Sequence, residues 1–498
     1  MTFVRLKPAQ RVLRSSITTL QAAAPAIVKP VPWHPHNYQT KAMRFLLEHA
    51  AGGLFLDPGL GKTSVVLGAA KVLRKEKLLQ RVLVIAPLRV CYRVWPAEQQ
   101  KWTDFAGLRV VVLHGAHKEE ALAQEADFYV INPDGLPWLI NSGAMKRLAP
   151  DTLVIDEGRR FRRTNTRTFK LLRPLLPKFK RRWLLTGSPN PNGYLDLFGQ
   201  IYVLDLGNAL GQYITHYRLN YFTPTGYGGY TWVLKEESDK AIQERIKPLV
   251  LRLDAEDLLK LPRIVPNVVR VDLPDKARKV YDDLEEEMLT VLEGGHTVEA
   301  VSAGAASVKC AQVANGGLYY RDEPKRLTLA PERAPRKWVD LHTAKIEAVE
   351  EIVDELNGAP VLVAYDFEHD RERLLRAFKS AEVLGGSPKE DERIERAWNA
   401  GKIGVLLGQP QSVAHGLNLQ ESQCQHVICH SLTWDYELYD QFIKRVRRQG
   451  NRHAQVFVHH VVARDTVDEA KLTALRRKRR TQAQLLDALR SYLKARHR

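Results

Sequence analysis

The segment DPGLGKTS, at residues 57–64, decides the fold of this chain. It follows a short apolar run at residues 53–56, and it opens a helical pattern of apolar residues at 65–70. A strand, a glycine-rich turn and a helix in this order are typical of a phosphate-binding loop. The sequence therefore predicts an α/β domain with a nucleoside triphosphate, ATP or GTP, at the end of that strand.

The residue types within the loop explain the prediction. Gly59 and Gly61 allow backbone N–H groups to turn toward phosphate oxygens, Lys62 adds positive charge near the β- and γ-phosphates, and the Thr63 hydroxyl is a ligand for Mg²⁺. Leu56 stands where the general GxxxxGK[ST] pattern has its first glycine, so only the narrower GxGKT form is present.

A pair of carboxylates supplies the second half of a nucleotide site. They lie in TLVIDEGRR, at residues 152–160, at the end of an apolar run. In that position Asp156 would hold Mg²⁺, and Glu157 would orient and deprotonate an attacking water. Two solvated acids that simply end a strand are the alternative, which the preceding phosphate-binding loop disfavours.

An arginine-bearing segment, QFIKRVRRQGN at residues 441–451, lies nearly four hundred residues from the loop. The spacing of Gln441, Arg445 and Arg448 predicts that a helix presents all three on one face. Such a face can reach a γ-phosphate across a cleft and neutralise charge in the transition state. Alone, this basic run would indicate a solvated or DNA-contacting helix, but its pairing with a phosphate-binding loop favours the catalytic interpretation.

The arrangement of apolar runs predicts two α/β lobes. Continuous runs are typical of strands that are buried on both faces of a parallel sheet. Five follow the first strand, beginning at residues 82, 110, 128, 152 and 182, and a second series begins at residues 361, 403, 426 and 455. We predict a basic arm at 1–34, a first lobe at 35–205, an insertion and linker at 206–265, a helical insertion at 266–340, a second lobe at 341–475 and a basic helix at 476–498.

Composition limits the class of partner. The 498 residues carry a net charge of +18, which favours a polyanionic partner, with nucleic acid as the leading candidate. Four scattered cysteines indicate a reducing cytoplasm rather than a disulfide framework. The chain has no run of eighteen apolar residues, so we expect no membrane span.

Two groups of residues have competing interpretations. The sequence CQHVICHS, at residues 424–431, resembles a zinc cluster superficially, but its apolar character favours a buried strand. The insertion is rich in aromatic residues between positions 213 and 232. We expect these to form a small core, with stacking on bases as the alternative.

Several ordered motifs make the chain similar to Snf-type helicase-like ATPases of superfamily two, in the compact form typical of bacteriophages and bacteria. The similarity covers residues 35–486. It includes HNYQTKAMRFLL at 36–47, APLRVCYRVWPAEQQKW at 86–102, FYVINPDGL at 128–136, LLTGSPNPN at 184–192 and VAHGLNLQ at 413–420. The resemblance implies two RecA-like lobes with parallel sheets, joined by a short helical insertion and linker region, with ATP and Mg²⁺ bound between the lobes.

The resemblance also implies roles for individual residues. Gln39 would read adenine, and Thr186 and Ser188 would couple hydrolysis to lobe movement. ATP-binding residues would be Gln39, Gly59, Gly61, Lys62, Thr63, Ser64, Gly416 and Gln441. Catalytic residues would be Lys62, Glu157, Arg445 and Arg448, with Thr63 and Asp156 as metal ligands. Nucleic-acid contacts would come from Pro87, Arg89, Trp95, Asn132, Arg160, Arg162 and Asn418.

One departure from the family pattern concerns coupling. Many relatives have His as the fourth residue of the DExH block, whereas this chain has Arg159, in a cluster that continues with Arg160, Arg162, Arg163 and Arg167. The cluster would either contact phosphates or form a solvated face, and the sequence leaves both alternatives open.

The function implied is ATP-driven translocation, remodelling or unwinding of DNA in phage or bacterial replication, recombination or repair. An ATP-gated DNA clamp that recruits other proteins, or an RNA helicase, are the alternatives. We expect a monomer in the cytoplasm of a bacterial or phage-infected cell, with a replication or recombination protein supplying target choice.

Overall fold

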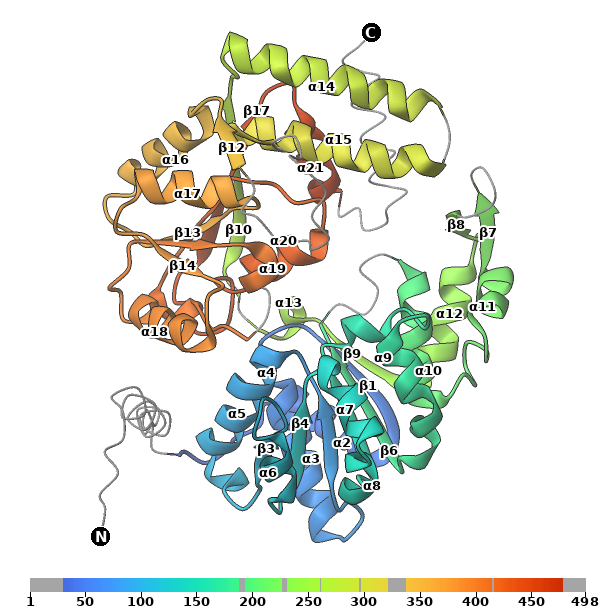
Figure 1. Ribbon diagram of the computed structural model, residues 1–498. Helices are drawn as coiled ribbons and strands as arrows, with labels where there is room; N and C mark the ends of the chain where they lie inside the picture. Colours follow the sequence, from blue (N-terminus) through green and yellow to red (C-terminus); the bar gives the residue numbers. More distant parts are fainter. Residues whose placement is uncertain are drawn as a thin grey trace, which may run out of the picture.

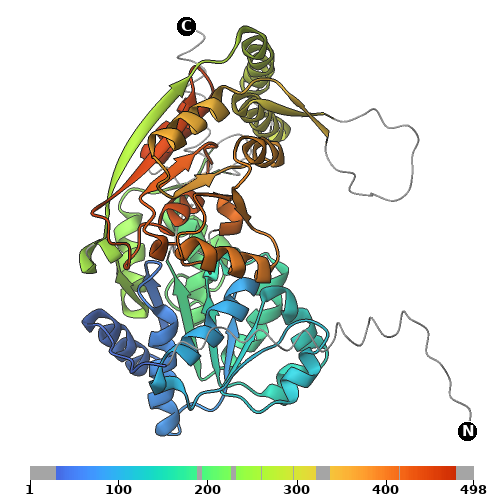
Figure 2. The same ribbon diagram turned by 90° about the vertical axis from the view of Figure 1, so that its left-hand side faces the viewer.

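The computed structural model describes residues 30–187, 193–225, 231–259, 261–294, 297–320, 337–413 and 416–477. Two α/β lobes are stacked on each other, with the first lobe below the second in Figure 1 and the same stacking in Figure 2. Most of the predicted basic arm, Ser188 and most of the predicted C-terminal helix lie outside the described residues. Predictions for those parts remain predictions.

Within the described residues, the first lobe is built on a sheet of seven parallel strands. In spatial order they are β3 (Val110–Val112), β4 (Phe128–Ile131), β2 (Val82–Ile85), β5 (Thr152–Asp156), β6 (Arg181–Thr186), β1 (Ala51–Leu56) and β9 (Val250–Leu253). The β4, β2 and β5 strands are buried along their whole length, as the continuous apolar runs predict.

Helices cover both faces of this sheet (Figure 1). They are α2 (Asn37–Glu48), α3 (Lys62–Lys75), α4 (Leu88–Arg93), α5 (Trp95–Lys101), α6 (Lys118–Ala123), α7 (Leu136–Asn141), α8 (Ala144–Leu148), α9 (Arg167–Leu172) and α10 (Leu197–Asp205). Two apolar clusters fill the lobe, one containing Phe198 and the other containing Trp95. The carboxyl ends of β1, β5 and β6 meet at one edge, which is where a doubly covered parallel sheet binds ligands.

The second lobe has a sheet of six parallel strands in the part of the chain that the structure describes. Their order is β10 (Arg263–Val271), β17 (Gln455–Ala463), β16 (His426–Cys429), β13 (Val361–Ala364), β15 (Val405–Gly408) and β14 (Glu382–Leu384). The helices are α16 (Ala344–Glu355), α17 (Glu368–Ala377), α18 (Pro388–Asn399), α19 (Pro410–Val413), α20 (Tyr436–Ile443) and α21 (Val467–Arg476). The two parallel sheets confirm the predicted α/β class with two RecA-like lobes.

The insertions project beside the two sheets (Figure 1). The first contains α11 (Ile214–Tyr221), α12 (Ser238–Ile246) and the antiparallel pair β7 (Phe222–Thr225) and β8 (Thr231–Leu234). Tyr217 and Phe222 are buried there and their rings pack together, but both belong to the apolar cluster of the first lobe that contains Phe198, rather than to a separate small core. The second insertion contains α14 (Asp275–Gly294), α15 (Thr297–Asn315) and the antiparallel pair β11 (Gly317–Tyr320) and β12 (Lys337–Asp340).

The linker between the lobes is short. The chain leaves the first sheet at β9, forms the single turn of α13 (Ala255–Leu258), and enters the second sheet as β10. Strand β9 therefore extends the first sheet beyond residue 205, and β10 begins the second sheet at residue 263, inside the segment that we predicted as linker. The predicted domain boundaries themselves remain predictions.

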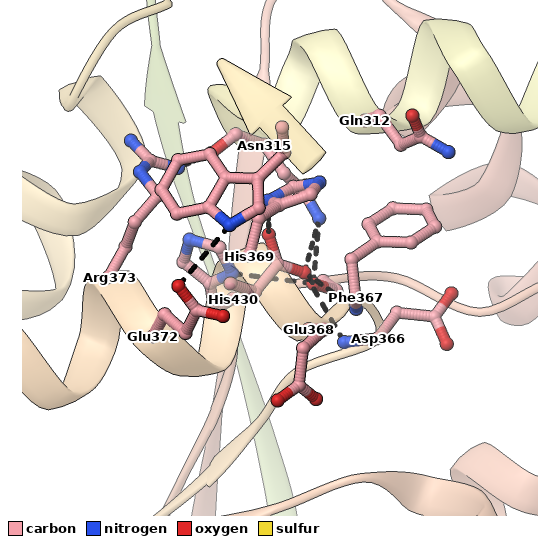
Figure 3. A network of polar contacts seen from close by, with 12 residues as sticks. Gln312, Asn315, Asp366, Phe367, Glu368, His369, Glu372, Arg373 and His430 are labelled. Carbon is pink, nitrogen blue, oxygen red and sulfur yellow. Dashed lines mark hydrogen bonds and ion pairs between the residues drawn. The ribbon is translucent and has the colours of Figure 1, made fainter. Parts of the chain in front are cut away.

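A network of polar side chains ties the ends of several second-lobe elements together (Figure 3). Buried Asp370 accepts hydrogen bonds from Asn315 at 2.9 Å and from Ser431 at 2.7 Å, and it pairs with His369 at 3.1 Å. Its partners hold the pKa of this carboxyl well below the ordinary range despite its burial. Asp370 therefore joins α15, α17 and the segment after β16, which leads into α20.

The sequence predicted neither a metal cluster at the cysteines nor a membrane span. Cys424 and Cys429 are buried in the apolar core of the second lobe, with Cys429 in strand β16. Among the described residues, no three His, Cys, Asp or Glu side chains converge as a metal site. None of the helices within those ranges has the length and apolar content needed to cross a membrane.

Candidate active site

The phosphate-binding loop connects β1 to α3, as predicted, and its shape depends on glycine. Gly59 has a φ of 94° and Gly61 a φ of 73°, in the left-handed region that side chains disfavour. A Cβ atom placed on Gly61 would lie 2.2 Å from Nε2 of Gln39. The loop therefore has neither the backbone freedom nor the space for a side chain at this position.

Gln39 lies directly on the loop. It is buried in α2, and its Nε2 atom donates to the backbone oxygen of Leu60 at 3.3 Å. Its Oε1 atom accepts from the backbone N–H of His36 at 2.9 Å. The predicted adenine contact is consistent with this position beside the loop, and the role itself remains a prediction.

Lys62 stands at the mouth of the loop. Its Nζ atom donates to the backbone oxygen of Leu56 at 2.8 Å and to that of Asp57 at 3.4 Å. Burial lowers the pKa of the ammonium group, while the carboxylates Glu157, Asp156 and Asp57 act in the opposite direction. The lysine is therefore held among three acids, in the electrostatic setting of a group that binds phosphate.

The loop and strand β5 carry the two residues predicted to bind Mg²⁺, Thr63 and Asp156. Thr63 and Ser64 are buried in the first turn of α3, and Ser64 donates to the backbone oxygen of Gly61 at 3.0 Å. Asp156 is buried at the end of β5, and Glu157 follows it with a φ of 54°. A non-glycine residue in the left-handed region carries backbone strain, which is concentrated at functional sites.

Burial changes the pKa of Asp156. Removal from water, and then the neighbouring charge of Glu157, raise the pKa of this carboxyl to about 7. Lys62 and the indole of Trp95 partly offset that increase. Trp95 Nε1 donates to Asp156 Oδ2 at 3.1 Å.

The second lobe places Arg448 on the phosphate-binding loop. A Cβ atom built on Gly59 would lie 2.7 Å from Arg448 Nε and 3.3 Å from its Cγ atom. Arg448 also donates to Asn418 Oδ1 at 2.7 Å. Arg445 is buried next to it, and donates to the backbone oxygen of Leu417 at 3.0 Å. Two residues predicted from opposite ends of the chain, Gly59 and Arg448, thus lie in contact.

The predicted helical face for these arginines is wrong. Helix α20 ends at Ile443, and Arg445 and Arg448 lie in the turns that follow. The backbone tightens there, since Arg445 N–H bonds to Phe442 and Val446 N–H bonds to Ile443, each three residues back. Each successive cation after the helix has its own tertiary partner. These contacts outweigh the local tendency of the chain to continue the helix.

Lys444 is a cross-lobe residue that the sequence reasoning missed. Its Nζ atom bonds to Asp57 Oδ1 and to Asp440 Oδ2, both at 2.9 Å. The other oxygen of Asp57 accepts from the backbone N–H of Ala255 in the linker, at 3.0 Å. The spacing of Asp440 and Lys444 indicated only a local pair within a helix. The contact with Asp57, far away in the chain, corresponds to no spacing pattern in the sequence.

Other second-lobe residues stand close to this junction. Gly416 has a φ of 73°, and a Cβ atom on it would lie 3.1 Å from the Cγ atom of Arg89. Gln441 is buried, and its Nε2 atom donates to Glu437 at 3.1 Å. The predicted ATP contacts of Gly416 and Gln441 remain predictions.

Two residues assigned to nucleic acid are better explained as internal contacts. Trp95 is fully buried, because its indole fills the core and bonds to Asp156, and its predicted contact with the nucleic-acid backbone remains a prediction. Arg162 is also buried, and both of its terminal nitrogens bond to Glu437 of the second lobe at 3.0 Å. It belongs neither to a phosphate-contacting nor to a solvated face, because its charge is compensated across the lobe interface.

The remaining predicted nucleic-acid residues lie in both lobes. Arg89 donates to the backbone oxygen of Ser412 at 2.6 Å and pairs with Asp391, both in the second lobe. Arg160 is exposed and bonds to Asp134 at 2.6 Å. Further positions are Pro87 at the start of α4, buried Asn132 after β4, and exposed Asn418. Thr186 is buried at the end of β6, next to the loop-bearing strand.

The residues present fit a magnesium–nucleotide complex. The two glycines with positive φ leave positions 59 and 61 of the loop without side chains, and Lys62 and Arg448 supply positive charge from opposite lobes. The Thr63 hydroxyl and the Asp156 carboxylate are oxygen ligands, the type that Mg²⁺ prefers. Only one oxygen of Asp156 is bonded to Trp95.

Comparison with known proteins identifies two family domains in this chain. A model of the SNF2-related domain matches residues 38–315, and a model of the helicase conserved C-terminal domain matches residues 344–450. The chain is 34% identical to putative protein p41 of Acyrthosiphon pisum secondary endosymbiont phage 1, over 91% of this chain and 98% of that protein.

More distant relatives are larger. The chain is 23% identical to the CHD3-type chromatin-remodeling factor PICKLE of Arabidopsis thaliana, over 89% of this chain and 34% of that protein. It is 24% identical to the ISWI chromatin-remodeling complex ATPase ISW2 of Saccharomyces cerevisiae, over 87% of this chain and 39% of that protein. The chain thus spans little more than a third of these two relatives.

A similar solved structure is the Sulfolobus solfataricus SWI2/SNF2 ATPase core in complex with dsDNA, with 20% identity, a TM-score of 0.43, and coverage of 94% of this chain and 97% of that one. The SNF2-related match covers more than half of the chain, and the phage relative extends over nearly all of it. This chain belongs to the SNF2-related family of proteins with a helicase C-terminal domain.

Proposed function

We propose that this protein is an ATPase that hydrolyses ATP to move along DNA, and that it remodels or unwinds the DNA as it moves. The observation that carries the proposal is the contact between Arg448 of the second lobe and Gly59 of the phosphate-binding loop. A nucleotide held by that loop touches both lobes, so its hydrolysis changes the energy of holding them together.

Each residue of the site has a role in the proposed mechanism. Lys62 binds the β- and γ-phosphates, Glu157 orients and deprotonates the attacking water, and Arg445 and Arg448 stabilise the charge that develops on the transferred phosphoryl group. Mg²⁺, when bound through Thr63 and Asp156, would neutralise charge on the phosphate oxygens. Loss of the γ-phosphate removes the bridge between Lys62 and Arg448, and the lobes then reopen.

The proposed partner is DNA. A net charge of +18 favours a polyanion, and Arg160, which is exposed after strand β5, is one residue that can contact phosphates. The relatives named as chromatin-remodeling proteins support this choice of partner. A role in phage or bacterial DNA replication, recombination or repair is part of this proposal.

Two substitutions test the hydrolytic site. Lys62→Ala removes the charge on the phosphates, so we expect loss of both ATP binding and turnover. Glu157→Gln keeps the shape of the site and removes the base, so we expect normal ATP affinity with turnover reduced by about 10²-fold or more. Calorimetric titration with ATP and a phosphate-release assay measure the two quantities separately. Turnover of the glutamine variant at the wild-type rate would show that Glu157 is not the base.

A comparison of nucleic acids separates the proposal from its alternatives. ATPase rates are measured with single-stranded DNA, duplex DNA, forked DNA and RNA, followed by displacement of a third strand from a DNA triplex. A translocase is stimulated by DNA and displaces the third strand. An ATP-gated clamp that recruits other proteins would bind DNA without displacement, and an RNA helicase would respond most strongly to RNA.

A further inference from the structure

The buried hydrogen bond between Trp95 and Asp156 has no role in the mechanism described so far. Trp95 opens α5, is fully buried, and directs its indole N–H to Asp156 Oδ2 at 3.1 Å. Its ring packs against Phe128 with centroids 5.8 Å apart, which fixes the orientation of the indole. A donor held this rigidly selects the rotamer of the carboxylate.

The helix that precedes Trp95 is in contact with the second lobe. Arg89 and Arg93, one turn apart on α4, form ion pairs with Asp391 and Glu395, also one turn apart on α18. The Arg93 pair has an N–O distance of 2.8 Å, with both side chains largely buried. Figure 2 shows α4 and α18 facing each other across the boundary between the lobes. Movement of the second lobe therefore acts directly on the segment that carries Trp95.

A second set of contacts leads from the same ion pair to the arginine on the loop. Glu395 accepts a hydrogen bond from the backbone N–H of Asn418 at 2.8 Å, and Asn418 Oδ1 accepts from Arg448 at 2.7 Å. Arg448 lies on Gly59 of the phosphate-binding loop. Glu395 thus stands between Arg93 on one side and the Asn418–Arg448 pair on the other.

We propose that Trp95 is a positioning residue, which holds the Asp156 carboxylate in the orientation needed for the metal-bound nucleotide and transmits the position of the second lobe to it through α4. The inference rests on the proposed function, because Asp156 is taken as the metal ligand. It supplies a physical route for coupling in a chain that has Arg159 where many relatives have a histidine.

The hydrogen bond to Asp156 is tested by a substitution at Trp95 and a matched control. Trp95→Phe keeps an aromatic ring in the core and removes the donor to Asp156. The matched control is Trp102→Phe, because Trp102 follows the same helix and its indole donates to Glu98 at 2.9 Å, away from Asp156. The affinity for ADP is measured by calorimetry with Mg²⁺ and with EDTA in its place, which needs no turnover.

We expect Trp95→Phe to leave the Mg²⁺-free affinity for ADP unchanged and to reduce the gain in affinity due to Mg²⁺ by about tenfold, the effect of one lost hydrogen bond to a charged group. Trp102→Phe should keep the wild-type gain. If Trp95→Phe loses affinity equally with and without Mg²⁺, or loses none, Trp95 does not position Asp156. The ADP titration tests the role of Trp95 independently of DNA. If the wild-type ATPase does not respond to DNA, that result rejects the proposed function and not the role of Trp95.

The coupling part of the inference is tested with a double-mutant cycle. Arg93→Gln removes the ion pair to Glu395, and the stimulation of ATPase by duplex DNA is compared in Arg93→Gln, Trp95→Phe and the double variant. If both residues act through one route, the double variant loses no more stimulation than the stronger single variant. If the fold-losses of DNA stimulation in the two single variants multiply in the double variant, α4 does not transmit the lobe position through Trp95.

Discussion

The two acids of the site are held in states that disfavour the folded protein. Burial raises the pKa of Asp156 to about 7, and Glu157 has a φ of 54°. When the pKa of a carboxyl is higher in the folded than in the unfolded protein, the free energy of unfolding is unaffected at low pH. It falls as the pH rises from the unfolded pKa to the folded pKa. The ionised form of Asp156 therefore lowers stability at neutral and alkaline pH, in exchange for a ligand that is ready for a metal ion.

Asp156→Asn should consequently stabilise the protein and abolish metal-dependent hydrolysis. The amide keeps an oxygen for the Trp95 N–H and removes the buried charge, so the free energy of unfolding should rise on the order of 3 kcal/mol at about pH 8. The gain should shrink steadily toward about pH 5, where less of the wild-type carboxyl is ionised. Thermal or denaturant unfolding in EDTA measures it. A gain that is independent of pH would show that Asp156 titrates normally.

Single residues were predictable where a local pattern carries the chemistry. Gly59, Gly61 and Lys62 follow from the loop spacing, and Asp156 and Glu157 follow from an apolar run that ends in two acids. Trp95 and Lys444 lay within quoted motifs, yet their partners Asp156 and Asp57 are distant in sequence. A hydrogen bond between residues that are far apart in the chain leaves no periodicity to detect.

At the scale of elements, α20 shows how a second-lobe helix docks on the first lobe. Its first turn carries Glu437, which accepts two hydrogen bonds from Arg162 of the first lobe and one from Gln441 of its own helix. Asp435 caps the helix by accepting from the backbone N–H groups of Glu437 and Leu438. The cap and the ion pair fix where α20 begins, and hence where the following arginines emerge.

Breaking this ion pair from one side should be more harmful than replacing it entirely. Arg162→Met leaves the Glu437 carboxylate buried without its main partner, which costs about 3–5 kcal/mol in such pairs. The double variant Arg162→Met with Glu437→Gln removes both charges and should regain most of that loss. Arg163→Met, at the exposed neighbouring position, serves as the control. Denaturant unfolding gives the comparison, and additive losses in the double variant would contradict a direct pair.

For the whole molecule, the sequence predicted two parallel α/β lobes because buried parallel strands appear as continuous apolar runs. It did not predict that β9 and β10 complete the edges of different sheets on either side of a short linker. Edge strands are only partly buried, so their apolar pattern is weak; β10 has intermediate and exposed positions and no buried one. Cross-lobe pairs such as Lys444 with Asp57 depend on how the lobes dock, which no local pattern encodes.

The measurement that tests the account most directly is single-turnover hydrolysis by Arg448→Ala. The side chain lies on Gly59, so its loss should leave ATP affinity within a few-fold of wild type and slow hydrolysis by about 10³-fold. Arg452→Ala, at an exposed position four residues further along, should hydrolyse ATP at the wild-type rate. Hydrolysis by Arg448→Ala as fast as by Arg452→Ala would show that the second lobe does not complete the site, and would contradict the motor mechanism.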